Sequence, residues 1–469
     1  MTFACGAEPL SVENEPEAET TASFLTVARP EVDATEAARM RKMMAPAAAG
    51  LVDPNESFYL AIHRRELERR WFLSAYLKQF SPGGPLSLAA RSLGIRVVSF
   101  RVQNGKLFVF DVDDRKQTTD NFFDQPVVEA YPIVDPTTLS AADARRFREY
   151  IVVDPAAGLN RYGVVGDTLG RYEIPFKVEL AFSQNFRALA DGASFEQAFT
   201  GHIDRPLPFD GVDPNPFRIT GILNLALRRY EEPEGFAPMP APGRKHYFET
   251  LPRRIPNTGD TETLAIKWHI HPGMKPIVWK ISPLVLKAQA RPEVAALEID
   301  LLGAIKAGIE SWNAAFGFEA LRAEVAESAT AFGDDDSNHL IWDVNPTVGF
   351  AFADFRPNPN NGQIRGASVY MNEGFLTGAL AQFGASPASV EPAGPAASVR
   401  LVWQAMNAAP LCDLHLDPFE KASRAAGLPA GTPASPKQRI EKSITFLIAH
   451  EIGHTLGLRH NFKGSLLPP

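Results

Sequence analysis

The sequence predicts an α+β protein, in which a β-rich N-terminal domain is followed by a domain of strands and helices. Two observations carry this prediction. Ile95–Phe100 alternates into Asn104-Gly105 before Leu107–Val112, and Asn-Gly suits the type I′ turn that joins two twisted strands. Residues 292–316 and 440–448 carry apolar side chains at spacings of three and four, which is typical of helices. The chain has 469 residues and is 45% hydrophobic, enough for two or three domains.

Changes in composition along the chain predict where these domains begin and end. Residues 1–50 are acidic and then rich in Ala and Met, which indicates a mobile leader. Residues 51–235 contain the short apolar runs of the β-rich domain, whose role the sequence does not reveal. Pro-rich residues 236–262 are predicted to be a linker, and residues 263–469 form the second domain.

The second domain opens with a predicted buried strand at Ile277–Ile281. A long helix is then predicted over Pro292–Phe316. Two further strands are predicted at His339–Val344 and Ile364–Met371, with a turn-rich stretch at residues 357–362 between them. The predicted order is therefore a strand, a helix and two more strands, before the helix that carries the main motif.

The charge distribution argues against two classes of partner. The chain has 47 basic and 55 acidic residues, and the net charge of -8 is spread along it. No basic stripe points to a nucleic acid. No apolar run approaches the length that spans a membrane. The sequence therefore predicts neither a nucleic-acid partner nor a transmembrane segment.

The most informative motif is His450-Glu451-Ile452-Gly453-His454, followed by Gly457 and His460. On a helix, His450 and His454 lie one turn apart on the same face, so both imidazoles can bind one zinc ion. Glu451 flanks the first ligand, where its carboxylate can act as a general base. Gly457 can adopt positive φ and turn the chain, which brings His460 back as a third ligand. The alternative is a polar patch on a surface helix.

The helix that must carry the pair is also signalled locally. Ser435-Pro436-Lys437-Gln438 has a Ser cap, Pro at the first helical position and Gln placed for a capping box. Apolar residues follow at helical spacing and would bury one side of the helix: Ile440, Ile444, Leu447 and Ile448. The two histidines would project from another side.

The segment AHEIGHTLGLRHNFKGS, Ala449–Ser465, resembles the active-site segment of the large bacterial zinc-dependent metalloproteases of the metzincin clan. The resemblance implies a zinc-dependent endopeptidase that acts on protein or peptide substrates. It implies that His450, His454 and His460 bind one catalytic zinc ion and that Glu451 is the general base. It also implies that residues 263–469 fold as a twisted sheet with an active-site helix.

In metzincins, the edge strand above the cleft pairs with extended substrate. Gly366, Ala367, Ser368 and Val369 fall where the resemblance puts that strand, so these four residues are candidates for substrate binding. An ordinary edge strand is the alternative.

The resemblance also implies something about completeness and activity. Family members continue past the third histidine into a C-terminal subdomain with a Met-containing turn beneath the metal, whereas this sequence stops at Pro469. The expectation is a truncated domain that lacks this subdomain, with His460 on a frayed end that has few contacts. The alternative function is therefore a catalytically incompetent homologue that acts as an envelope binding protein. A gluzincin, in which a downstream Glu is the third zinc ligand, is a further alternative, but it would give Gly457 and His460 no role in the metal site.

Three other features have both a functional and an ordinary interpretation. Phe3-Ala4-Cys5-Gly6 resembles the junction of a bacterial lipoprotein. The resemblance implies that Cys5 is lipidated and that the protein is extracytoplasmic, that is, secreted, periplasmic or bound to the envelope. No signal peptide precedes the segment in this sequence, and an accidental match is the alternative. Asp334-Asp335-Asp336 is a candidate calcium site or a solvated turn. His269 and His271 lie on one side of a predicted strand, and we interpret them as ordinary strand residues.

Overall fold

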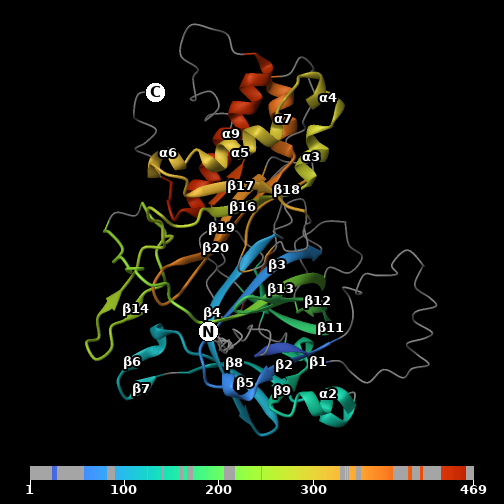
Figure 1. Ribbon diagram of the computed structural model, residues 1–469, viewed down its shortest axis with the longest axis vertical. Coiled ribbons are helices and arrows are strands. Elements are labelled where there is room, and N and C mark those ends of the chain that lie inside the picture. Colours follow the sequence, from blue (N-terminus) through green and yellow to red (C-terminus); the bar gives the residue numbers. More distant parts are fainter. Residues whose placement is uncertain are drawn as a thin grey trace, which may run out of the picture.

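The computed structural model describes most of the chain between residues 24 and 460 (Figure 1). The described residues are 24–28, 58–81, 90–123, 125–139, 141–158, 162–165, 173–204, 217–243, 246–327, 333, 335, 337–344, 350–383, 400–403, 412–415 and 435–460. They form an α+β fold that is rich in strands, as the sequence predicts. Cys5 lies outside them.

The largest sheet within the described residues is antiparallel and has nine strands. In sheet order they are β21 (Arg400–Trp403), β10 (Tyr162–Val165), β11 (Glu173–Leu189), β12 (Gly192–Ile203), β13 (Arg218–Arg229), β3 (Trp71–Ser81), β4 (Arg91–Gln103), β5 (Lys106–Asp111) and β8 (Val127–Pro132). The predicted hairpin joins β4 and β5, where Gln103 pairs with Lys106. Asn104 and Gly105 have φ of 49° and 70°, the positive values that a type I′ turn requires.

Smaller elements surround this sheet. They are the three-stranded sheet of β1 (Leu25–Ala28), β2 (Tyr59–His63) and β9 (Tyr150–Val153), the pair β6 (Gln117–Thr119) and β7 (Phe122–Phe123), helix α2 (Ala141–Arg146) and the 3-10 turns η3 (Arg64–Glu66), η4 (Asp114–Lys116), η5 (Pro136–Thr138) and η6 (Pro155–Gly158). The leader predicted over residues 1–50 needs a correction, because β1 pairs with β2 and Leu25 is fully buried. Local sequence could not show this pairing, since β2 lies more than thirty residues downstream.

The described residues of the predicted linker, 236–243 and 246–262, are held by pairing with their neighbours. They contain the short pair β14 (Arg253–Arg254) and β15 (Thr261–Glu262). Isolated bridges join Pro240 to Leu264 and Glu249 to Ala265. These pairings make the segment part of the folded structure around residues 264–265. Proline has no N–H to donate, but isolated bridges need few backbone hydrogen bonds and therefore tolerate it.

The second sheet has six strands in the described residues. In order they are β17 (Leu321–Val325), β16 (Ile277–Ile281), β18 (Asn338–Asp343), β20 (Ile364–Asn372), β19 (Phe350–Pro357) and β22 (Cys412–His415). The first four are parallel to one another, and β19 is antiparallel to both of its neighbours. The strands predicted from residues 277, 339 and 364 onwards are confirmed as β16, β18 and β20.

Helices lie on one side of this sheet (Figure 1). They are α3 (Leu284–Gln289), α4 (Pro292–Ala296), α5 (Leu301–Glu310), α6 (Asn313–Phe316), α7 (Gly374–Phe383) and α9 (Pro436–Thr455). The single helix predicted over residues 292–316 is wrong, because the chain breaks at Glu298, where φ is 52°. Asp300 then caps α5 by accepting a hydrogen bond from Gly303 N at 2.9 Å.

The two faces of the six-stranded sheet have different partners. Alternate residues of β19 and β20 face the helices and join their apolar core, including Ala353, Phe355 and Val369. The intervening residues face the nine-stranded sheet. There Asp354 accepts a hydrogen bond from Ser92 N at 2.6 Å, and the Tyr76 hydroxyl lies 3.2 Å from Ser368 Oγ. The two large sheets therefore share a buried polar interface.

Asp335 lies at the centre of that interface. Its carboxylate is fully buried, with Arg365 Nη2 at 3.3 Å, Arg356 Nε at 3.4 Å and Arg228 Nη1 at 3.8 Å. Arg228 belongs to β13, so one carboxylate links the two sheets. The interpretation as a solvated turn is wrong for this residue, which is fully buried. The three guanidinium groups also make the surroundings of Asp335 unfavourable for a calcium ion. Asp334 and Asp336 lie outside the described residues.

We expect Asp335→Ala to lower the free energy of unfolding by about 3–5 kcal/mol, because it leaves buried guanidinium groups short of a counter-charge. Urea or thermal unfolding of the purified protein measures this change. Glu319→Ala is the matched control, since the Glu319–Arg322 pair is about half exposed and should contribute little. Equal stability of Asp335→Ala and the unsubstituted protein would contradict the account of this interface.

Candidate metal centre

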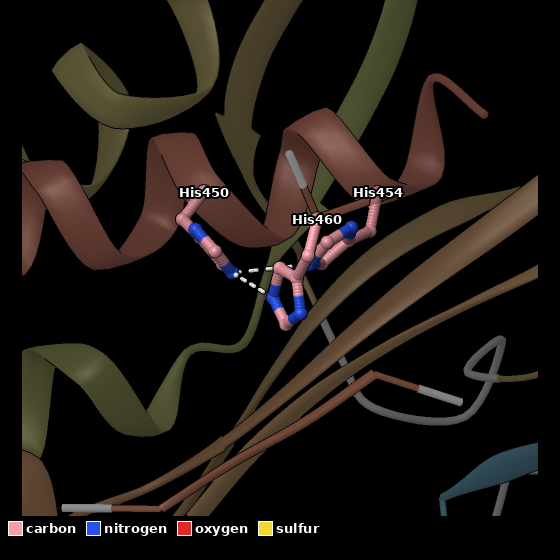
Figure 2. Close-up of side chains that lie close together, drawn as sticks. All are labelled: His450, His454 and His460. Carbon is pink, nitrogen blue, oxygen red and sulfur yellow. Dashed lines mark hydrogen bonds between the residues drawn. The ribbon is translucent and has the colours of Figure 1, made fainter. Parts of the chain in front are cut away.

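Helix α9 positions the first two histidines. Ser435 Oγ accepts from Gln438 N at 3.3 Å and Gln438 Oε1 accepts from Ser435 N at 3.0 Å, so the predicted capping box is present. The apolar residues of the predicted stripe are all fully buried in the helical core: Ile440, Ile444, Leu447 and Ile448. Because these side chains fix the rotation of the helix, His450 and His454 project together from another side (Figure 2).

Two close approaches fix the position of α9 against α5 and against Trp312, the residue before α6. A Cβ on Gly308 would lie 2.7 Å from Ile448 Cβ, and one on Gly453 would lie 2.8 Å from the Trp312 ring. Trp312 also donates a hydrogen bond from Nε1 to the carbonyl oxygen of Ala449 at 2.9 Å. The backbone next to His450 is therefore held by an indole as well as by apolar packing.

Gly457 turns the chain after the helix. Its φ is +94°, and a Cβ at this position would overlap the carbonyl oxygen of Ile266. The segment that follows is ordered by backbone hydrogen bonds, including Arg459 N to His246 O at 2.8 Å. The expectation that His460 would have few ordering contacts is therefore wrong, because a segment far upstream in the sequence pairs with the residues before it.

The three imidazoles converge at their Nε2 atoms (Figure 2). His450 Nε2 lies 3.0 Å from His454 Nε2 and 3.1 Å from His460 Nε2. Among the described residues, these are the only three or more His, Cys, Asp or Glu side chains that come together with metal-ligand spacing. Nitrogens bound to a tetrahedral zinc ion at 2.0–2.1 Å would be separated by about 3.3 Å. The observed separations fit that geometry.

The hydrogen bond of His454 explains why a cation suits this cluster. His454 Nδ1 lies 2.7 Å from the carbonyl oxygen of Leu458. A carbonyl has no proton to give, so Nδ1 donates, and Nε2 of the neutral ring carries a lone pair. That lone pair faces the nitrogens of the other two rings. A cation between the rings could accept the lone pairs of all three nitrogens, in place of the hydrogen bonds that now join them.

Burial keeps the histidines neutral. Burial, and to a smaller extent the neighbouring His454 and His460 rings, lower the pKa of His450 to about 4. Burial likewise lowers the pKa of His454 to about 4, although the hydrogen bond to Leu458 acts in the opposite direction. The pKa of His460 is also lowered, mainly by burial and then by Arg459. The imidazole lone pairs are therefore available for a metal at neutral pH.

Glu451 follows His450 on α9, and its carboxylate is fully buried. His454 is only 4% exposed. The site thus combines three imidazole nitrogens at metal-ligand spacing with a carboxylate one residue away along the helix; Glu451 and His454 are buried, His450 is half-buried and His460 is exposed. Such a set can hold a divalent cation and move a proton beside it.

The comparisons with known proteins agree with this geometry. A family model described as Met-zincin matches residues 432–469. The matched segment contains α9 and all three histidines, so this end of the chain is a metzincin-like region, consistent with a metalloprotease. No curated protein and no solved structure matches the chain.

The predicted substrate strand does not lie at an edge. Gly366, Ala367, Ser368 and Val369 belong to β20, which has β19 on one side and β18 on the other. Ser368 Oγ donates to Asp354 Oδ1 at 2.7 Å, and Arg356 occupies the space next to Gly366. Their backbone and side chains are therefore engaged within the fold, and pairing with extended substrate at these residues is excluded. The sequence could not reveal this, because edge position depends on which other strands join the sheet.

The other histidine pair singled out in the sequence, His269 and His271, is not part of the triad. The rings of His269 and His271 are 4.6 Å apart, and Phe236 packs edge-on against His269. They do not belong to the metal-ligand group found among the described residues. Within the same residues, no helix combines the length and apolar character needed to cross a membrane.

Proposed function

We propose that the protein is a zinc-dependent endopeptidase in which His450, His454 and His460 hold one zinc ion and Glu451 is the general base. The observation that carries the proposal is the convergence of three neutral imidazole nitrogens with zinc-ligand spacing on and beside α9. The Met-zincin match over residues 432–469 supports the same assignment.

In this proposal, Glu451 and His454 have different roles in peptide hydrolysis. Zinc, when bound, supplies a Lewis acid that polarises the peptide carbonyl and lowers the pKa of a water molecule. Glu451 accepts the proton of the attacking water and passes it to the leaving amine. The hydrogen bond from His454 Nδ1 to the carbonyl oxygen of Leu458 would hold the ring so that Nε2 could bind the ion. The buried surroundings of Glu451 strengthen its electrostatic interactions, because few water molecules screen them.

A chelation experiment tests this proposal. The purified protein is incubated with an unstructured protein such as casein, then treated with a metal chelator, and finally supplied with zinc. We expect cleavage that the chelator stops and stoichiometric zinc restores. Binding of zinc without cleavage of any peptide library would favour the alternative, an envelope binding protein that lacks activity. Cleavage that persists without metal would refute the metal assignment.

We further propose that the protein acts outside the cytoplasm and that Cys5 carries a lipid anchor. The support is the Phe3-Ala4-Cys5-Gly6 segment, which resembles a lipoprotein junction. In a bacterial host that expresses the gene from its own start, Cys5→Ser should move the protein from the membrane fraction to the soluble fraction. An unchanged distribution of the variant would contradict the anchor.

A further inference from the structure

Residues 246–248 pair with the turn that precedes His460. Phe248 N donates a hydrogen bond to Gly457 O at 2.8 Å, and Arg459 N donates to His246 O at 2.8 Å. Between these two bonds, Tyr247 and Leu458 form an antiparallel bridge. The result is a short two-stranded ladder whose second strand leads directly into His460. We call residues 246–248 the clasp.

The clasp is itself anchored on its other side. Phe248 O accepts a hydrogen bond from Ile266 N at 2.8 Å. Lys267 then continues the connection to the start of β20, with Lys267 N donating to Gly362 O at 3.0 Å and Lys267 O accepting from Ile364 N at 2.8 Å. The indole of Trp268 donates to Thr455 O at 2.8 Å, at the last residue of α9. Backbone hydrogen bonds thus connect the six-stranded sheet to the turn after the helix through the clasp.

The side chain of Phe248 adds a second contact with the metal centre. The ring is 5% exposed, and its centroid lies 6.2 Å from that of His454 in an edge-on arrangement. Phe355 supports it from β19, with ring centroids 5.0 Å apart. The His454 imidazole is therefore oriented by two groups, the carbonyl oxygen of Leu458 and the ring of Phe248.

We propose that Phe248 is a positioning residue of the metal centre. Its ring orients the His454 imidazole, and its backbone, through the clasp, holds the Gly457–Arg459 turn so that His460 reaches the same cation. The inference rests on the proposed zinc site and adds a residue more than two hundred positions upstream of the motif. Phe248 touches the ligand His454, so its effect appears first in metal affinity.

Two matched Phe→Leu variants test the proposal. Phe248→Leu removes the ring beside His454. Phe352→Leu removes another buried ring, which stacks on Tyr370 on the sheet face opposite the helices. For each protein, three quantities are measured: the zinc dissociation constant by competition with a chromophoric chelator, the visible spectrum of the cobalt-substituted form, and the melting temperature of the metal-free form.

We expect Phe248→Leu to weaken zinc binding about 10- to 100-fold, the usual cost of losing support behind a ligand, and to alter the cobalt spectrum. Phe352→Leu should lower the melting temperature while leaving zinc affinity and the cobalt spectrum unchanged. Excess zinc should restore peptide cleavage to Phe248→Leu, which separates a positioning defect from misfolding. Unchanged zinc affinity and spectrum in Phe248→Leu would overturn the proposal. An unsubstituted protein that binds no zinc would instead refute the proposed function.

Discussion

Glu451→Gln is expected to lower the rate of peptide cleavage by about two to four orders of magnitude while zinc stays bound. The amide has nearly the shape of the carboxylate but cannot accept the proton of the attacking water. The three histidine ligands remain on α9 and the turn after it, so the metal is retained. The measurement is kcat/KM on a fluorogenic peptide, together with metal analysis of the same preparation.

Glu441→Gln is the matched control for this change. Glu441 lies on the same helix, where its carboxylate accepts a hydrogen bond from Asp300 N at 2.7 Å, ten residues before Glu451. The same chemical change there should leave the specific activity almost unaltered. Full activity in Glu451→Gln would show that another group moves the proton and would refute the assignment of the base.

His454→Ala is expected to abolish the stabilisation that zinc confers on the folded protein. A ligand that binds only the folded state stabilises it by an amount that grows with the logarithm of its affinity. The loss of one of three nitrogens removes most of that affinity, so little stabilisation should remain. The loss should exceed the roughly 10- to 100-fold effect of removing a residue that only supports a ligand. Thermal unfolding with and without equimolar zinc measures it.

His269→Ala is the control for the loss of a histidine outside the triad. Its ring contacts Phe236 and His271. The variant should keep the zinc-induced rise in melting temperature in full. A His454→Ala protein that still gains the same stabilisation would mean that zinc binds elsewhere on the chain.

The sequence predicted best those parts of the fold that local chemistry determines. The Ser435 cap, Gln438 and the apolar stripe specify α9 because every contact that defines the start and rotation of a helix lies within a few residues or on one face. Asn104-Gly105 specified the β4–β5 hairpin for the same reason, since the turn conformation is a property of two residues.

Features that depend on distant partners were missed or misplaced. Val369 and its neighbours were expected at a sheet edge, but β19 pairs with them because the chain returns antiparallel. Phe248 lies in a Pro-rich stretch whose composition suggests a connection, and only the folded chain brings it to His454. Asp335 looked solvated because its neighbours in sequence are acidic, whereas its partners in space are three arginines. In each case the deciding contact crosses a separation that no local pattern encodes.

The central claim is that three imidazole nitrogens bind one zinc ion, and X-ray absorption spectroscopy of the zinc-loaded protein tests it most directly. The account predicts one zinc ion per chain, with three imidazole nitrogens and one oxygen at about 2.0–2.1 Å. His460→Ala should reduce the imidazole count to two or prevent loading. A spectrum without three imidazole ligands, or a zinc content far below one per chain after loading, would contradict the account.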